Sequence, residues 1–190
     1  MGGIGHNGGP SLDGGFSWRR HCWSSARAAL LPTLPIEVVR RRVKRAGELG
    51  LDYRTYAGVR AATGHDVVAF LFSSNALRVS ALCPAMPLDR KEKLAALQCG
   101  RIGLAVLPMT PGVVQEANAG LLDASHAAPY ALAAFGEIRD RVRAALGRLP
   151  SDQVILVGDP GLERDWCAAG RLAGYLPAER YFAQASTPRA

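Results

Sequence analysis

The sequence has few features that would place the chain in a membrane or outside the cell. The apolar run at residues 67–72 (VVAFLF) is too short to cross a membrane, because a membrane helix needs roughly 20 apolar residues. The opening residues have neither the basic region nor the apolar region of a secretory signal peptide. We therefore expect a cytoplasmic protein without a membrane span.

Cysteine is scarce and its four positions are scattered. Cys22, Cys83, Cys99 and Cys167 form no CxxC pair, and zinc sites are normally built from closely spaced pairs of ligands. Cysteines of a cytosolic protein are mostly reduced, so the sequence predicts free structural thiols and no metal site. A zinc site assembled from His21, Cys22 and distant residues is the alternative.

The motifs that identify common enzyme classes are also missing. The sequence has no GxxxxGK[ST] phosphate loop, no GxGxxG after a strand and no GxSxG nucleophile turn. Whether the chain is an enzyme is therefore open at this level. With 48% hydrophobic and 21% charged residues, the chain is expected to fold around a packed core.

Positive charge is plentiful, and it is concentrated in the first third of the chain. The formal net charge is +7, and residues 1–60 hold ten cations and only four anions. A dense cluster of cations attracts the phosphate backbone of a nucleic acid whatever its base sequence. The alternatives are a solvated helix face, an acidic protein partner or an anionic membrane surface. The cluster consists of Arg40, Arg41, Arg42, Lys44 and Arg45.

Two helices are expected around this cluster. Residues 34–50 have a proline suited to a first helical turn and a glycine suited to a helix end. Residues 52–64 follow, with Asp52 as the N-cap and Gly64 at the end. Helical spacing predicts an apolar stripe along the first helix, formed by Ile36, Val39, Val43 and Ala46.

After residue 64 short apolar runs alternate with helical stretches. This alternation predicts an α/β fold, with a small, mostly parallel sheet covered by helices. A helix-turn-helix over residues 53–77 is the alternative for the first part, but the β-branched and aromatic residues of 67–72 favour a strand. The expected strands are 67–72, 102–107 and 154–157, and the expected helices are 89–97, 113–118, 130–146 and 162–172. The domain prediction is a Gly-rich tail with a Trp/Arg segment (1–30), a basic helical module (31–64) and an α/β domain (65–190).

The segment 151–175 holds the best candidate for a site residue. An expected strand ends there at Gly158, and Asp159 and a Pro-Gly turn follow. Side chains just beyond the carboxyl end of a strand in an open α/β sheet face the crevice where ligands bind. Asp159 could therefore hold Mg²⁺ or orient a water. The alternative is that it caps the turn or helix that follows. A few strand-end residues elsewhere, Ser73, Ser74 and Asn75, could bind a phosphate or another anion.

The same segment resembles the fourth motif of haloacid-dehalogenase-like phosphohydrolases. The resemblance covers about 40 residues and implies a site with Asp159 and Asp165 near a metal. It departs from the family at the first strand, where the nucleophilic aspartate of a DxDxT pattern should stand. Ser73, Ser74 and Asn75 occupy that place, so a phosphoaspartyl intermediate cannot form. The residues that carry the resemblance are Gly158, Asp159, Asp165, Ala168, Ala169, Ala173 and Gly174.

The opening peptide resembles the GIGHNGGP-like start of small bacterial proteins of uncharacterised function, and this resemblance implies no activity. Its composition predicts a flexible tail.

Taken together, the residues favour a non-enzymatic binding or regulatory protein that engages nucleic acid or another polyanion through its basic helices and needs no cofactor. The alternative is a haloacid-dehalogenase-like phosphohydrolase, or a degenerate relative, with Mg²⁺ as its cofactor. A third possibility is a subunit whose basic helices pack on an acidic protein.

Overall fold

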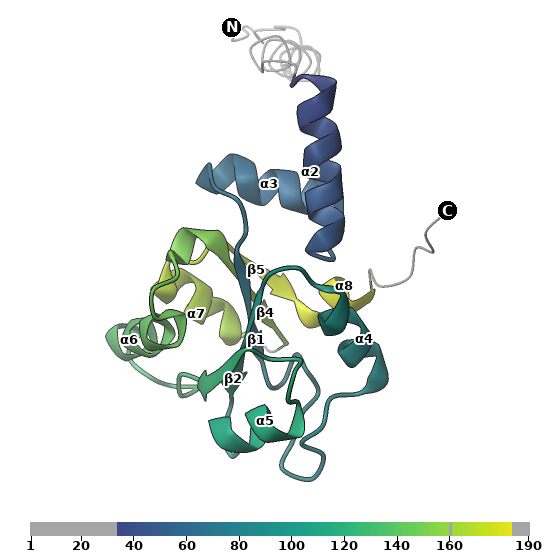
Figure 1. Cartoon of the computed structure of the whole chain (residues 1–190). Helices are drawn as coiled ribbons and strands as arrows, with labels where there is room; N and C mark the ends of the chain where they lie inside the picture. Colours follow the sequence, from purple (N-terminus) through teal and green to yellow (C-terminus); the bar gives the residue numbers. More distant parts are fainter. Residues whose placement is uncertain (1–33, 160, 184–190) are drawn as a thin grey trace, which may run out of the picture. The chain divides into compact units, whose positions relative to one another are not determined.

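The computed structural model describes residues 34–159 and 161–183, and the chain falls into two compact units, residues 1–39 and 40–190. The whole sheet lies in the second unit, and so do all of the described helices except the first four residues of the first one. Figure 1 shows how these elements are arranged. The described helices are α2 (Ile36–Glu48), α3 (Tyr53–Thr63), α4 (Leu88–Ala96), α5 (Pro111–Ala117), α6 (Phe135–Leu146), α7 (Glu163–Gly170) and α8 (Ala178–Ala183). The strands are β1 (Ala69–Ser73), β2 (Gly100–Ala105), β3 (Ala124–Ala127), β4 (Val154–Gly158) and β5 (Gly174–Pro177), and a 3-10 turn (Ser151–Gln153) precedes β4.

The five strands form one parallel sheet in the order β3-β2-β1-β4-β5. Strand β1 lies at its centre, where Ala69 is paired with Gly100 of β2 and with Val154 of β4. Strands pair with both edges of β1 and helices cover both faces of the sheet, so all five of its residues are buried, as expected for the inner strand of a parallel sheet. The predicted α/β fold with a parallel sheet covered by helices is therefore confirmed.

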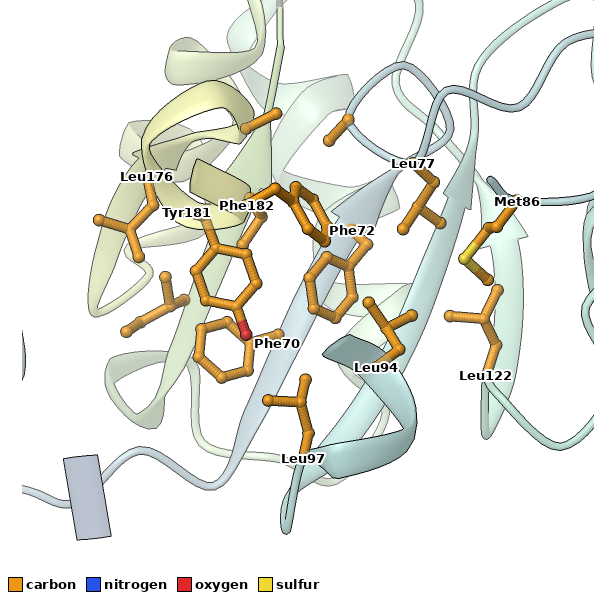
Figure 2. Close-up of a cluster of buried hydrophobic side chains, with 14 of the residues drawn as sticks. Phe70, Phe72, Leu77, Met86, Leu94, Leu97, Leu122, Leu176, Tyr181 and Phe182 are labelled. Carbon is orange, nitrogen blue, oxygen red and sulfur yellow. The ribbon is translucent and has the colours of Figure 1, made fainter. Parts of the chain in front are cut away.

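Two apolar cores cover the two faces of the sheet. Successive side chains of a strand point to opposite faces, and in β1 Phe70 and Phe72 enter one core while Ala69 and Leu71 enter the other. The first core is completed by α4, α5 and α8 and contains the aromatic side chains Tyr181 and Phe182 (Figure 2). The second core is completed by α6 and α7.

The chain reverses direction across the sheet at β1, and this reversal creates a switch point. From β1 it proceeds through α4 and α5 to β2 and β3, and it then returns through α6 to β4 on the other side of β1. Right-handed crossovers put helices of opposite direction on opposite faces, which accounts for the two helix layers. The crevice outside the carboxyl ends of β1 and β4 is where ligands of such sheets normally bind.

The helix ends follow the expected local chemistry, whereas two expectations about elements need correction. The Asp52 side chain accepts a hydrogen bond from the Thr55 N–H (2.8 Å) as the N-cap of α3, and Gly64 ends this helix with a left-handed φ of 77°. The strand preferred for residues 67–72 is confirmed as β1, which lies within residues 53–77 and so overturns the alternative of a helix-turn-helix there. The helix expected over 130–146 begins only at Phe135, because the residues before it connect β3 to α6.

None of the helices formed by residues 34–159 and 161–183 is both long and apolar enough to cross a membrane.

Candidate functional sites

The five clustered cations lie on α2, but they differ in exposure. Arg40, Arg41 and Lys44 are exposed and Arg42 is half-buried. Residues four apart lie on the same side of a helix, about 6 Å apart along its axis, so Arg40 and Lys44 form one row with Arg41 beside it. We call these three residues the basic surface.

Arg45 belongs to the cluster in sequence but serves the fold. Its Nε donates to the Asp66 carboxylate (3.1 Å), and its two terminal nitrogens donate to the Glu48 carboxylate (3.0 Å) and to the Val67 carbonyl (3.0 Å). The Nη1 atom of Arg45 also donates a hydrogen bond to the Gln98 carbonyl (3.1 Å). Because its nitrogens are used inside the chain, Arg45 is excluded from the basic surface.

The predicted apolar stripe of α2 is only partly right. Ala46 is buried, but Ile36 and Val43 are 61% and 50% exposed. The buried side of the helix is instead formed by Ala46 and Leu49, with Arg45 partly covered beside them. Arg45 directs its guanidinium inward to Asp66, a contact that apolar spacing alone does not predict.

At the other end of the sheet, Asp159 lies where the sequence predicted it. It directly follows Gly158, the last residue of β4, and its side chain is exposed. Its backbone N–H donates to the Glu163 carboxylate (2.9 Å). Asp159 therefore lies at the switch point between β1 and β4, with a second carboxyl group beside it.

That second group, Glu163, was not singled out by the sequence analysis. It is the first residue of α7 and is only 2% exposed. One carboxylate oxygen accepts from the Asn75 side-chain amide (2.8 Å) and the other from the Asp159 N–H. Burial raises the pKa of Glu163, and hydrogen bonds from Ser73, Asn75 and Asp159 oppose this shift in part.

A periodic signal could have identified Glu163. Trp166 and Gly170 share its side of α7 at helical spacing and are buried with it, whereas Asp165 is exposed. The carboxyl group that interacts electrostatically with Asp159 is that of Glu163. Asp165 was chosen from sequence as the second acid because the motif has a second aspartate after the first, without regard to which side of the helix faces inward.

The strand-end residues Ser73, Ser74 and Asn75 mostly bond within the chain. The Ser73 hydroxyl accepts from the Ala76 N–H (3.0 Å), and the Ser74 hydroxyl accepts from the Val106 N–H (3.0 Å). Both serines are buried, whereas Asn75 is half-buried. Of the three, Asn75 is the one placed to contact a ligand at the carboxyl edge.

The residues at this edge do not fit a magnesium ion well. Mg²⁺ prefers an octahedral set of oxygens, usually including one or two carboxylates, but both Glu163 oxygens accept hydrogen bonds from the chain itself. Among residues 34–159 and 161–183, no group of three or more His, Cys, Asp or Glu side chains is placed to hold a metal ion.

Several expectations from sequence concern residues outside the described ranges. They include the flexible tail, the GIGHNGGP-like peptide and the zinc alternative at His21 and Cys22. Within the described part, Cys83, Cys99 and Cys167 are free thiols, as expected. Comparisons with protein-family models, with curated proteins and with solved structures found no match to this chain.

Proposed function

We propose that this chain is a non-enzymatic polyanion-binding protein and that the basic surface of α2 is its binding site. The observation that carries the proposal is that Arg40, Arg41 and Lys44 are exposed together on one side of a single helix. Nucleic acid is the polyanion best suited to such a row, because it presents regularly spaced phosphates to cations on a rigid element.

Arg45 supports this assignment indirectly. Its bonds to Asp66 and to the Val67 carbonyl fix the inner side of α2 on the residues that precede β1. The exposed cations are therefore held on an anchored helix, so less side-chain and backbone freedom is lost on binding. A merely solvated helix face would attract a polyanion no more than other exposed cations of the chain do.

The test compares two double variants that lose the same charge. Arg41→Ala with Lys44→Ala removes two cations of the basic surface, whereas Arg143→Ala with Arg148→Ala removes two exposed cations near the end of α6. Binding of a fluorescent DNA duplex is measured by anisotropy at several salt concentrations. Each lost phosphate contact should reduce the slope of log affinity against log salt by about 0.9.

The expected result is a slope reduced by nearly two for the α2 variant and little changed for the α6 variant. Equal losses in the two variants would mean that overall charge, and not the basic surface, attracts the polyanion. Wild-type protein that binds neither duplex, single-stranded nucleic acid nor heparin at low salt would overturn the proposal.

A second candidate function is favoured by the switch point between β1 and β4. Asn75, Asp159 and Glu163 come together there, at the place where the fourth-motif resemblance puts its site. Since the first strand lacks the nucleophilic aspartate, this candidate is a degenerate phosphohydrolase-like domain that binds a phosphate ester without hydrolysing it. Phosphate monoesters should then raise the melting temperature of the wild type but not of Asn75→Ala, which removes the side-chain amide that could donate to the phosphate, with no phosphate released in the presence of Mg²⁺. Phosphate release by the wild type would contradict the non-catalytic form of this candidate.

A further inference from the structure

Large apolar side chains are exposed in every connection that follows a strand from β1 to β4. Leu82 lies in the connection from β1 to α4, and Leu88 is the first residue of α4. The connections after β2, β3 and β4, together with the first residue of α6, supply the other four. Their exposed fractions are Leu82 99%, Leu88 70%, Leu107 66%, Leu132 95%, Phe135 60% and Leu162 56%. We call these six residues the apolar rim.

The topology places the apolar rim on one end of the molecule. Parallel strands have their carboxyl ends at the same edge, and β3, β2, β1 and β4 are consecutive neighbours in the sheet. With about 4.8 Å between strands, the four connections leave the sheet within about 15 Å of one another. The connections that carry the rim residues therefore all begin around the switch point.

The longest of these connections is held in place by the body of the protein. The Asn118 side chain, 2% exposed, accepts from the Met86 N–H (2.8 Å) and donates to the Pro84 carbonyl (2.9 Å). These bonds fix the residues between Leu82 and Leu88 against the end of α5. The two leucines are thus presented by an anchored loop, which reduces the entropy lost on contact with a partner.

The amount of apolar surface matches a protein interface. At roughly 100 Å² for each fully exposed large side chain, the rim presents on the order of 500 Å². A standard interface buries about 800 Å² on each partner, a little more than half of it non-polar. The rim alone thus supplies the non-polar share of one such interface, and a patch of this size on a monomer is often functional.

We infer that the apolar rim is a self-association surface and that its partner is a second copy of this chain. Exposed charges of both signs lie in the same connections and first helical turns: Arg78 and Arg164 with Asp89, Glu137, Asp159 and Asp165. A two-fold contact brings each residue of one copy against the other copy's matching surface, so a mixed set of charges can pair with itself. A nucleic acid or an anionic membrane would instead meet four carboxylates.

The basic surface and the rim do not compete for space. Arg45 of α2 bonds to the carbonyls of Val67 and Gln98, which precede β1 and β2, so α2 meets the amino edge of the sheet. The rim lies at the carboxyl edge. Self-association is therefore compatible with polyanion binding and does not depend on it.

The test is the mass of the full chain in solution, measured by sedimentation over a range of protein concentrations. Leu82→Asp with Leu132→Asp places two charges in the rim at almost fully exposed positions, so the melting temperature should be unchanged. Ile36→Asp with Val43→Asp is the matched control, because it also adds two charges, at two exposed apolar residues of α2. We expect a wild-type dimer, a control dimer and a rim variant that dissociates at least tenfold more readily.

A wild type that stays monomeric at every concentration would overturn the inference. So would a dimer that survives both rim substitutions or is lost equally in the control with Ile36→Asp and Val43→Asp. Addition of a DNA duplex separates the two proposals, because a rim variant that is monomeric should still bind DNA if the basic surface does so.

Discussion

The side-chain amide of Asn75 donates a hydrogen bond to the buried carboxylate of Glu163 at 2.8 Å, although the two residues are 88 positions apart in the chain. Asn75 follows β1 and Glu163 begins α7. The second Glu163 oxygen accepts from the Asp159 N–H at the end of β4. One buried side chain therefore joins the two strand ends on either side of the switch point.

Replacing Glu163 by Gln should destabilise the fold even though the shape is conserved. A carboxamide has one acceptor oxygen where the carboxylate has two, so its NH₂ group would face a donor, either the Asn75 amide or the Asp159 N–H. An unmade buried hydrogen bond of this kind costs about 1–3 kcal/mol. Urea unfolding at neutral pH measures the loss. Glu116→Gln, at an exposed position of α5, is the control and should change the free energy of unfolding by less than about 0.5 kcal/mol.

The same variant should also change how stability depends on pH. Because burial raises the pKa of Glu163 above its ordinary 4.5, the folded state binds this proton more tightly than the unfolded state. The free energy of unfolding contributed by Glu163 therefore falls as pH rises from about 4.5 through the folded-state pKa. Glu163→Gln removes this fall. Parallel stability curves for the two proteins in the mildly acidic range would contradict the assignment.

Lys93 should produce the opposite dependence at alkaline pH. Its ammonium group is buried, donates to the Tyr181 carbonyl and lies 4.1 Å from the centre of the Tyr181 ring. Burial and the nearby Arg90 lower the pKa of Lys93 from 10.5 to about 8. Between these values the unfolded state holds the proton more tightly, so the free energy of unfolding contributed by Lys93 rises with pH.

Lys93→Met should remove that rise while filling the same space. The wild type and Lys93→Met have to be compared with each other, because Cys99 titrates in both. Burial raises the pKa of Cys99 to about 11, so its contribution to the free energy of unfolding falls over part of the same pH range. Stability curves from pH 8 to 10.5 that differ only by a constant would show that Lys93 does not titrate there.

The parts of the fold that could be predicted are those fixed by local chemistry. The apolar runs that became β1 and β4, the Asp52 cap and the Gly64 helix end each depend on residues adjacent in sequence. Strands β3 and β5 were missed because ASHA and GYLP carry no strong strand preference. They form because β2 and β4 offer unpaired backbone groups at the edges of the sheet.

The candidate sites were predictable only in part, for the same reason. The position of Asp159 follows from the strand that precedes it, so sequence placed it correctly. Arg45 was grouped with the exposed cations and Glu163 was missed, because the roles of both depend on distant partners, Asp66 and Asn75. A row of cations or a pair of acids in sequence does not reveal which member faces inward.

The close approach of Gly158 to Glu163 provides a last prediction, which checks the packing at the switch point. A Cβ atom at Gly158 would lie 2.5 Å from the nearer Glu163 oxygen and 2.8 Å from the Tyr175 ring, whereas one at Gly47 would meet nothing within 4 Å. Gly158→Ala must therefore displace the buried carboxylate and should lower the free energy of unfolding by about 1–3 kcal/mol. Gly47→Ala lies within α2 and should raise it by about 0.5–1 kcal/mol, because alanine loses less backbone freedom in a helix. Urea unfolding of the two variants at neutral pH compares the same chemical change at both sites. If Gly158→Ala proved as stable as Gly47→Ala, the Glu163 side chain could not occupy the buried position that joins β1 to β4.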